Sequence, residues 1–199
     1  MGMSTLLDII GSMIIGGIIM STVFRLSDAA TEKTYNNSGE LSLQQNLATV
    51  AQIVEHDFRK IGYCLDWNKL PDPSKAILYA NPNKIKFLTD IEPDGVLDSI
   101  FYYVGPTSEL TETPNPRDRV LYRVVNNETP AKSNLGVTDF HMIYYDALGD
   151  TIYFPIDNFG LISSIEINVT VENVAAYDTL YSRAYWRQIR MVARNLKNR

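Results

Sequence analysis

Four carboxylates lie within residues 90–98 and are of the side-chain type that binds calcium. Asp90, Glu92, Asp94 and Asp98 alternate with apolar or turn-forming residues. A calcium ion takes about 6–8 oxygen ligands, so a site of this kind needs several converging carboxylates. The spacing does not complete an EF-hand loop. A solvated acidic turn is the preferred interpretation, and a calcium site is the alternative.

Cys64 is the only cysteine, so no disulfide forms within the chain. A thiol nucleophile needs a neighbouring base. The two histidines offer little here, because His56 lies in a helical pattern and His141 in a strand pattern. We therefore expect Cys64 to be a small buried side chain.

Other catalytic and nucleic-acid-binding patterns are missing from the sequence. There is no glycine-rich phosphate loop, no zinc-spaced Cys/His set and no Gly-x-Ser-x-Gly motif. The net charge of −5 argues against direct binding of nucleic acid, which depends on clustered cations. We interpret the basic C-terminal residues as a solvated helix or strand end; they are Arg187, Arg190, Arg194, Lys197 and Arg199. The chain is therefore not expected to be an enzyme.

Asp8 is the most unusual charged residue, because the next sixteen residues, Ile9–Phe24, carry no charge. A carboxylate at the centre of a bilayer costs about 2.5–3.5 kcal/mol. One interpretation places Asp8 near the headgroups, as a helix N-terminal charge favoured by the dipole. The other pairs it with a cation from another subunit. The residues alone do not decide between them.

The apolar run that follows Asp8 has the length of a membrane-spanning helix. From Met3 to Phe24 there are twenty-two residues with Asp8 as the only charge, and a span needs about 20. A cleaved secretory signal would have a basic start and a small-residue cleavage site, and a buried core helix would be shorter. Small residues in the run allow close approach of another helix in lipid. They are Gly11, Ser12, Gly16, Gly17, Ser21 and Thr22.

A second helical pattern follows and ends before residue 63. Its apolar residues recur every three or four positions and predict one buried stripe. The stripe consists of Leu43, Leu47, Val50, Val54, Phe58 and Ile61. Asn36–Gly39 is expected to break or kink the helix, and Gly62 to terminate it.

The remainder of the chain has the pattern of short β-strands. They are rich in Ile, Val, Tyr and Phe and are bounded by Pro, Gly, Asn or Asp. In the tyrosine pairs, one ring is expected to face the core and the other solvent or a partner. Ala147–Gly149 predicts a hairpin loop. The predicted strands are Ala76–Ala80, Lys84–Thr89, Ser99–Val104, Arg119–Val125, Val137–Asp146, Thr151–Phe154 and Ser163–Glu172.

The predicted fold class is α+β, with a long hydrophobic N-terminal helix packed on an antiparallel β-sheet head. We expect three parts. Residues 1–25 form a membrane or filament-core helix, 26–62 an amphipathic stalk, and 63–199 a β-rich head.

The segment Ser4–Gly11 resembles the conserved start of type IV pilin-like proteins. Leu41–Cys64, with its ending Asp57–Tyr63, is similar to the stalk end of minor pilins and of the J-type minor pseudopilin of type II secretion. The resemblance covers nearly the whole chain. The weaker head motifs are Leu121-Tyr122-Arg123, Val137-Thr138-Asp139-Phe140, Tyr144-Tyr145-Asp146 and Arg194-Asn195-Leu196.

This resemblance implies processing and assembly at the N-terminus. A prepilin peptidase would cut between Met3 and Ser4, which makes Asp8 the fifth mature residue. In the family, the carboxylate at that position meets the N-terminal amine of a neighbouring subunit. Here Asp8 replaces the usual Glu, Met3 the usual Gly and Ser4 the usual Phe.

The resemblance also implies a function and a location. We expect a structural subunit, a minor pilin or pseudopilin, of a filament used in secretion, adhesion or DNA uptake. Its partners would be other pilin-like subunits, contacted through the N-terminal helix. It would be inserted once in the inner membrane, with its head on the periplasmic or extracellular side. The alternative is a permanently anchored ligand-binding or adhesin domain. No cofactor is expected apart from the calcium considered above.

Overall fold

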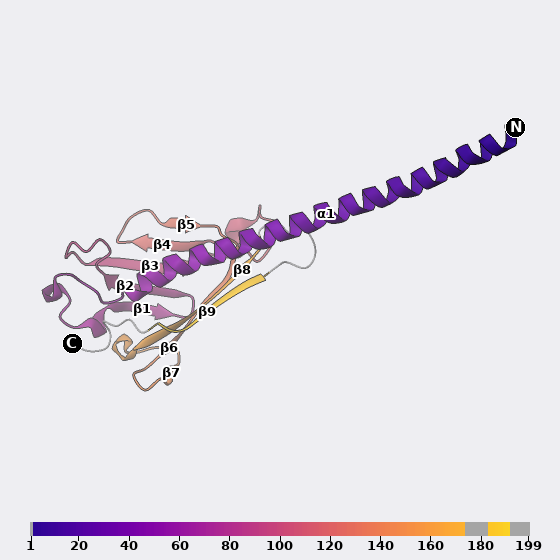
Figure 1. Ribbon diagram of the computed structural model, residues 1–199. Coiled ribbons are helices and arrows are strands. Elements are labelled where there is room, and N and C mark those ends of the chain that lie inside the picture. The colour runs from indigo at the N-terminus through magenta and orange to yellow at the C-terminus, as the bar shows by residue number, and fades with distance from the viewer. Residues whose placement is uncertain (1, 174–182, 192–199) are drawn as a thin grey trace. The chain divides into compact units, whose positions relative to one another are not determined.

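The structure, a computed structural model, describes residues 2–173 and 183–191, and the side chains of residues 5–173. The chain divides into two compact units, Met1–Leu41 and Ser42–Arg199. Helix α1, Gly2–Arg59, belongs to both units, and every strand belongs to the second. The predicted α+β class, a long apolar N-terminal helix followed by antiparallel sheet, is confirmed (Figure 1).

Helix α1 is continuous because no proline occurs before Pro71. The break expected at Asn36–Gly39 is wrong, since helix continues through these residues. Glycine in a helix interior costs only about 1 kcal/mol relative to alanine, and asparagine less. One glycine and two asparagines do not interrupt the favourable propagation of a helix this long.

Gly62 terminates the helical segment as the sequence predicts. Its φ of 75° is in the left-handed region that favours glycine. The N–H of Gly62 donates to the carbonyl of Leu88, 3.0 Å away, at the end of a neighbouring strand. The chain thus leaves the helix already hydrogen-bonded to the sheet.

The strands form two antiparallel sheets rather than one. The first sheet has the order β1-β2-β3-β4-β5 and the second has the order β7-β6-β8-β9. The strands of the first are β1 Ile77–Asn81, β2 Lys84–Thr89, β3 Asp98–Val104, β4 Leu121–Val125 and β5 Ala131–Ser133. Those of the second are β6 Val137–Tyr145, β7 Thr151–Ile152, β8 Ser164–Glu172 and β9 Arg183–Met191.

Seven of these nine strands match predicted ones, and two were missed. Strand β5 has only three residues, too few for a period-2 pattern. Strand β9 contains Arg187 and Arg190 of the basic C-terminal set, and it pairs with β8 at the edge of the second sheet. Arg194, Lys197 and Arg199 lie outside the described residues.

Alternating burial in the strands follows the sequence. Ile85 and Phe87 are buried in β2 while Lys84 and Lys86 are not. In the tyrosine pairs, Tyr102 and Tyr144 are buried and their neighbours are only partly covered. The predicted hairpin between β6 and β7 is confirmed by the pairing of Tyr145 with Thr151.

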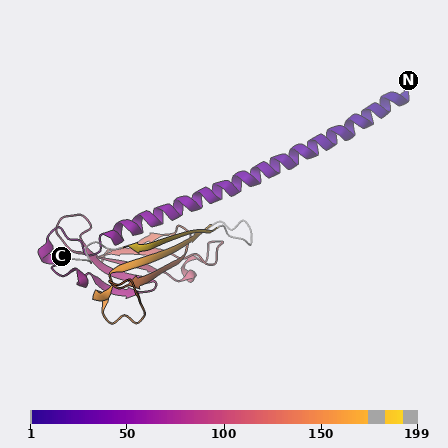
Figure 2. The same ribbon diagram turned by 60° about the horizontal axis from the view of Figure 1, so that its bottom comes forward.

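The core of the second unit lies between the sheets and the C-terminal part of α1, which Figure 2 shows from a second direction. The predicted stripe is confirmed, because Leu43, Val50, Val54, Phe58 and Ile61 are buried and Leu47 packs against them. The ring of Phe58 lies edge-on to Phe87 at 5.3 Å and near Tyr102 at 5.5 Å. This part of the helix is therefore an integral component of the head.

A chain that begins at Ser42 is expected to fold and stay soluble, because every buried apolar side chain in the described residues lies from Leu43 onward. Circular dichroism should show mainly β structure, and thermal unfolding should be cooperative. A chain that begins at Glu55 loses Leu43, Val50 and Val54, each worth about 2–5 kcal/mol in a packed core, and should not fold. Aggregation of both truncated chains would contradict this division of the molecule.

Candidate functional site

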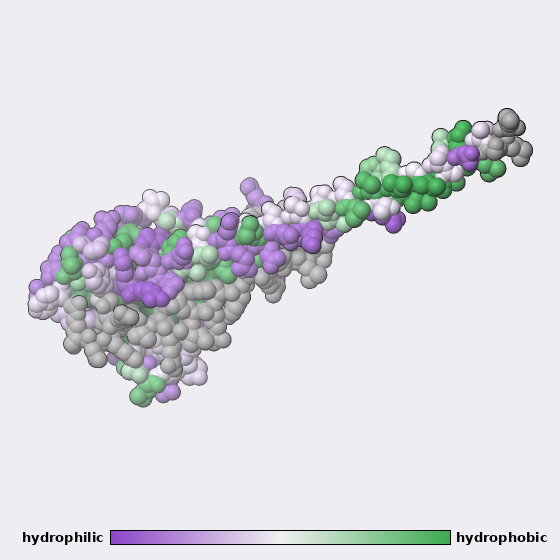
Figure 3. Space-filling model, in the orientation of Figure 1, coloured by the Kyte–Doolittle hydropathy of each residue, from purple (hydrophilic) through white to green (hydrophobic). Residues whose placement is uncertain are grey.

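The apolar segment of the first unit is exposed along its whole length. Every large apolar side chain from Leu6 to Leu26 is exposed, and the most apolar stretch has none of its residues buried. Figure 3 shows this stretch as an almost continuous hydrophobic surface. By length and composition the helix is sufficient to cross a membrane. Covering these side chains is worth on the order of 20 kcal/mol, so their exposure to water is strongly unfavourable.

The polar groups in the apolar segment are satisfied within the helix. The hydroxyl of Ser12 donates to the carbonyl of Ile9 at 2.9 Å, and that of Thr22 to Ile18 at 2.8 Å. Internal pairing of this kind lowers the cost of placing hydroxyls in lipid. Gly11, Gly16 and Gly17 have no other heavy atom within 4 Å of where a Cβ would stand, so their notches are open.

Asp8 lies in α1 immediately before the uncharged segment and is exposed. Among the described residues it has no hydrogen bond or ion pair. The nearest cation along the helix, Arg25, is about 25 Å away at 1.5 Å per residue. Any compensating charge for Asp8 must therefore come from outside residues 5–41 of the same chain. Met3 and Ser4 lie in the first turns of α1, where only the backbone is described.

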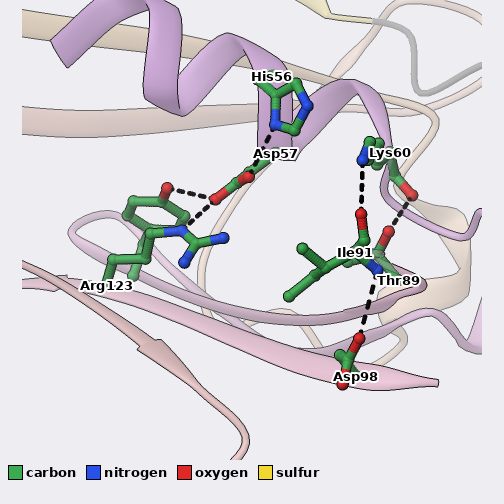
Figure 4. Close-up of polar contacts among 8 residues, drawn as sticks. His56, Asp57, Lys60, Thr89, Ile91, Asp98 and Arg123 are labelled. Atoms are coloured by element: carbon green, nitrogen blue, oxygen red, sulfur yellow. Dashed lines mark hydrogen bonds and ion pairs between the residues drawn. The ribbon is translucent and has the colours of Figure 1, made fainter. Parts of the chain in front are cut away.

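A second constellation joins α1 to the first sheet and was not predicted as a site. The carboxylate of Asp57 is buried and accepts a hydrogen bond from the hydroxyl of Tyr102 at 2.6 Å. It also accepts from Nε of Arg123 and contacts Nδ1 of His56 at 3.2 Å (Figure 4). One carboxylate thus binds groups from the helix, from β3 and from β4.

The charges of this constellation reinforce one another. Burial lowers the pKa of Arg123, but the hydrogen bond and the charge of Asp57 outweigh that effect, so its pKa is raised. Burial and the neighbouring Asp57 raise the pKa of the Tyr102 hydroxyl, which therefore stays protonated and donates. The sequence signal was an acid on the apolar stripe, between Val54 and Phe58.

The helix end and the following loop are tied to the same sheet. Nζ of Lys60 donates to the carbonyl of Ile91 at 2.8 Å. The backbone carbonyl of Lys60 accepts from the hydroxyl of Thr89, also at 2.8 Å. The N–H of Ile91 donates to Asp98 at 3.3 Å (Figure 4). Residues 57–63 are thus the point at which the helix is fixed to the head.

The acidic loop is organised by hydrogen bonds to its own backbone. Asp90 is fully buried and accepts from the N–H groups of Leu65, Asp94 and Gly95. Burial raises the pKa of this carboxyl, but the three donors outweigh burial and the net shift is downward. The interpretation as a solvated turn is therefore wrong for Asp90, because its carboxylate replaces water with backbone donors.

The other acids of the loop have separate roles. Glu92 and Asp94 are exposed, and Asp98 accepts from the side-chain amide of Asn126 at 2.8 Å. Across the described residues, no three His, Cys, Asp or Glu side chains come together in a way that could hold a metal ion. The four acids thus do not form the predicted alternative, a calcium site, in this arrangement.

Cys64 is buried in the hydrophobic core, as expected. His56 is largely exposed beside Asp57, and His141 lies partly covered in β6. These positions agree with a packing role for the thiol.

Asp118 is a buried acid with an unusual environment. Only 1% of its surface is exposed, and neither carboxylate oxygen has a hydrogen-bond partner in the part of the chain described. Burial is the main reason that the pKa of this carboxyl is raised. Thr113 lowers it in part, and the charge of Glu172 adds to the rise.

Glu172 itself is buried in a hydrogen-bonded pair. It contacts the guanidinium of Arg117 and the amide of Asn115, each at 2.9 Å. The charge of Glu172 is therefore compensated by Arg117, whereas the nearby buried acid Asp118 has no such partner among the described residues.

Comparisons with protein-family models, with curated proteins and with solved structures give no match for this chain. The arguments that follow therefore use its own residues.

Replacement of Asp57 by alanine is expected to destabilise the head by about 3 kcal/mol, because it leaves Arg123 and Tyr102 without their shared acceptor. The 27% exposure of the Arg123 side chain keeps the loss at the lower end of the range for broken buried pairs. Urea unfolding measures the loss. Glu55→Ala removes an exposed helix pair with Arg59 and should cost less than about 0.5 kcal/mol. Equal stability of both variants would contradict the role of Asp57.

Asp118→Asn is expected to stabilise the protein at pH 7 by about 1 kcal/mol, since it removes an unsatisfied buried charge. The raised pKa sets the pH dependence. The contribution of Asp118 to stability is fully retained below the unfolded pKa of an aspartate, near 3.9, and is lost as pH rises through the folded pKa. The difference between variant and wild type should therefore shrink at pH 3.5 in urea titrations. Asp139→Asn, at an exposed site, is the control. Parallel stability curves for Asp118→Asn and wild type would rule out this account.

Proposed function

We propose that this chain is a structural subunit of a membrane-assembled filament of the pilin-like kind. The main support for the proposal is that the two parts of α1 differ in burial. Its residues 42–59 are packed into a β-rich head, while the apolar residues before them are not covered by any of the residues that the structure describes. A subunit that inserts into a bilayer and then packs among other helices needs these two properties.

The distribution of small residues supports repeated helix association. Ser12 and Gly16 form one pair of small residues four apart, and Gly17 and Ser21 form another. At 3.6 residues per turn, the two pairs lie about 140° apart around the helix. Pairs of this spacing allow close helix packing in lipid. Two different faces allow one helix to contact two neighbours, and such heterologous contacts can continue into a filament.

Asp8 supplies the chemistry by which subunits would join. Its carboxylate is costly in lipid and has no partner in the described part of its chain. We propose that the N-terminal amine of a neighbouring subunit, released by a prepilin peptidase between Met3 and Ser4, neutralises it. The head would face the periplasm or the exterior, and the role would be structural rather than enzymatic.

Variants of Asp8 test this proposal. Asp8→Ala and Asp8→Asn should reach normal levels in the membrane, because both remove a charge from a membrane helix. Both should be lost from fibres released by shearing, whereas Asp8→Glu keeps the charge and should assemble. Asp28→Ala, in the exposed helix beyond the uncharged segment, is the matched control and should assemble normally. The measurement is the fraction of protein in sheared fibres against that in the membrane.

Normal assembly of Asp8→Ala would remove the role assigned to this carboxylate. Absence of fibres from wild type and every variant, with all the protein recovered as a detergent-soluble monomer, would favour a permanently anchored ligand-binding head instead.

A further inference from the structure

The β6–β7 hairpin presents an apolar side chain on a rigid turn. Leu148 at its tip is 87% exposed, and Tyr153 just after β7 is 82% exposed. The carboxylate of Asp146 accepts the N–H groups of Leu148, Gly149 and Asp150, each at 2.9 Å. The turn is thus ordered before any contact is made, so binding through Leu148 costs little conformational entropy.

The hairpin and the sequence on either side of it carry acidic side chains but no lysine or arginine over residues 133–182. Asp150 and Asp157, on either side of β7, are exposed. A partner surface for the hairpin must therefore combine an apolar hollow with a cationic group.

A groove with these properties lies elsewhere on the same head. A cavity of about 270 Å³ is bordered by Val50, Ile53 and Val54 of α1, Leu121 of β4 and Ala131 of β5. Ile53 is 43% exposed within it. The volume falls below the range of about 300–1,000 Å³ typical of small-molecule sites, which favours insertion of a side chain.

Two cations, Arg123 and Lys132, line the groove, and Arg123 is the one bound to Asp57. Its side chain borders the cavity and also a separate, more open depression beside His56. Its Nε donates to Asp57 and the guanidinium also lies beside the hydroxyl of Tyr102, while Figure 4 draws no dashed line to its two terminal nitrogens. Those terminal N–H groups can bind a carboxylate from outside.

The hairpin and the groove cannot meet within one molecule. Figure 1 places β7 and its hairpin at the lower end of the head and β4 and β5 at the upper end. The strands also lie in different sheets. Any contact between them therefore joins two copies of the chain.

We propose that the β6–β7 hairpin of one copy docks in this groove of the next. Leu148 enters the apolar cavity, and the carboxylate of Asp150 binds the terminal nitrogens of Arg123. Because the two surfaces differ, the contact is heterologous and repeats from copy to copy without closing. The inference deepens the proposed filament role, on which it rests for its biological setting, by naming the contact between neighbouring heads.

Disulfide trapping in the full-length chain, reconstituted in lipid vesicles, tests this contact. One preparation carries Leu148→Cys and the other Ala131→Cys, with different tags. After mild oxidation we expect mixed dimers that contain one chain of each kind. A chain with both substitutions should give a ladder of multimers, because the contact does not close. The parent chain, whose only thiol is the buried Cys64, gives the background.

Matched variants separate the docking contact from random collision. Val96→Cys, also at an exposed apolar position of the head, replaces Leu148→Cys and should give only background. Ile53→Glu in the groove, or Asp150→Lys on the hairpin, should lower the mixed-dimer yield by about tenfold. Asp139→Lys, at an exposed acid of β6, should leave the yield unchanged.

The result that overturns the proposal is a mixed-dimer yield no higher than that of the Val96→Cys control. Fibres that form without this cross-link would leave the filament role intact and exclude the hairpin contact. The cross-link without any fibres would retain the contact and exclude the filament role. Absence of both would exclude both.

Discussion

The uncovered apolar surface of α1 is the constraint on which the rest of the molecule depends. A helix exposed on all sides from Leu6 to Leu26 is unfavourable in water, because covering its side chains is worth more than the usual net stability of a folded domain. By length and composition this helix is sufficient to cross a membrane. The polar side chains of the apolar segment are satisfied within the helix, since the hydroxyls of Ser12 and Thr22 donate to its carbonyls. The carboxylate of Asp8 has no partner of this kind among the described residues.

The head binds the C-terminal part of the same helix through many contacts. The apolar stripe around Val54 and Phe58 provides most of the burial, and Asp57 fixes the rotation of the helix by binding Tyr102 and Arg123 together. A force transmitted along the helix would reach the sheet through these contacts. Arg123 also faces the groove proposed for the neighbouring head, so the fixing of the helix and the contact between heads share one residue.

The fold was largely predictable because its signals are local. The stripe from Leu43 to Ile61, the stop at Gly62 and the alternation in Lys84–Thr89 each follow from short-range periodicity or backbone geometry. The division into two sheets and the presence of strand β5 could not be predicted, because both depend on pairing between segments that are distant in the sequence. The same limit hid the constellation around Asp57, whose partners lie 45 and 66 residues away. The burial of Asp90 could not be predicted for the same reason. An acid at a turn is expected to be solvated unless the positions of backbone N–H donors around it are known. Asp8 could be proposed from the sequence because an acid next to sixteen uncharged residues is a local feature.

In the proposed filament, the apolar helix would exchange lipid for other helices when subunits assemble. The most direct test is a nitroxide at position 14, introduced by Ile14→Cys in the full-length chain, whose Cys64 is buried. Collision with dissolved oxygen, measured by electron paramagnetic resonance, reports contact with lipid. The account predicts high oxygen accessibility in vesicles and a marked fall in fibres released by shearing. Accessibility that stays high in every preparation would show a helix that remains an anchor in lipid and would contradict the account.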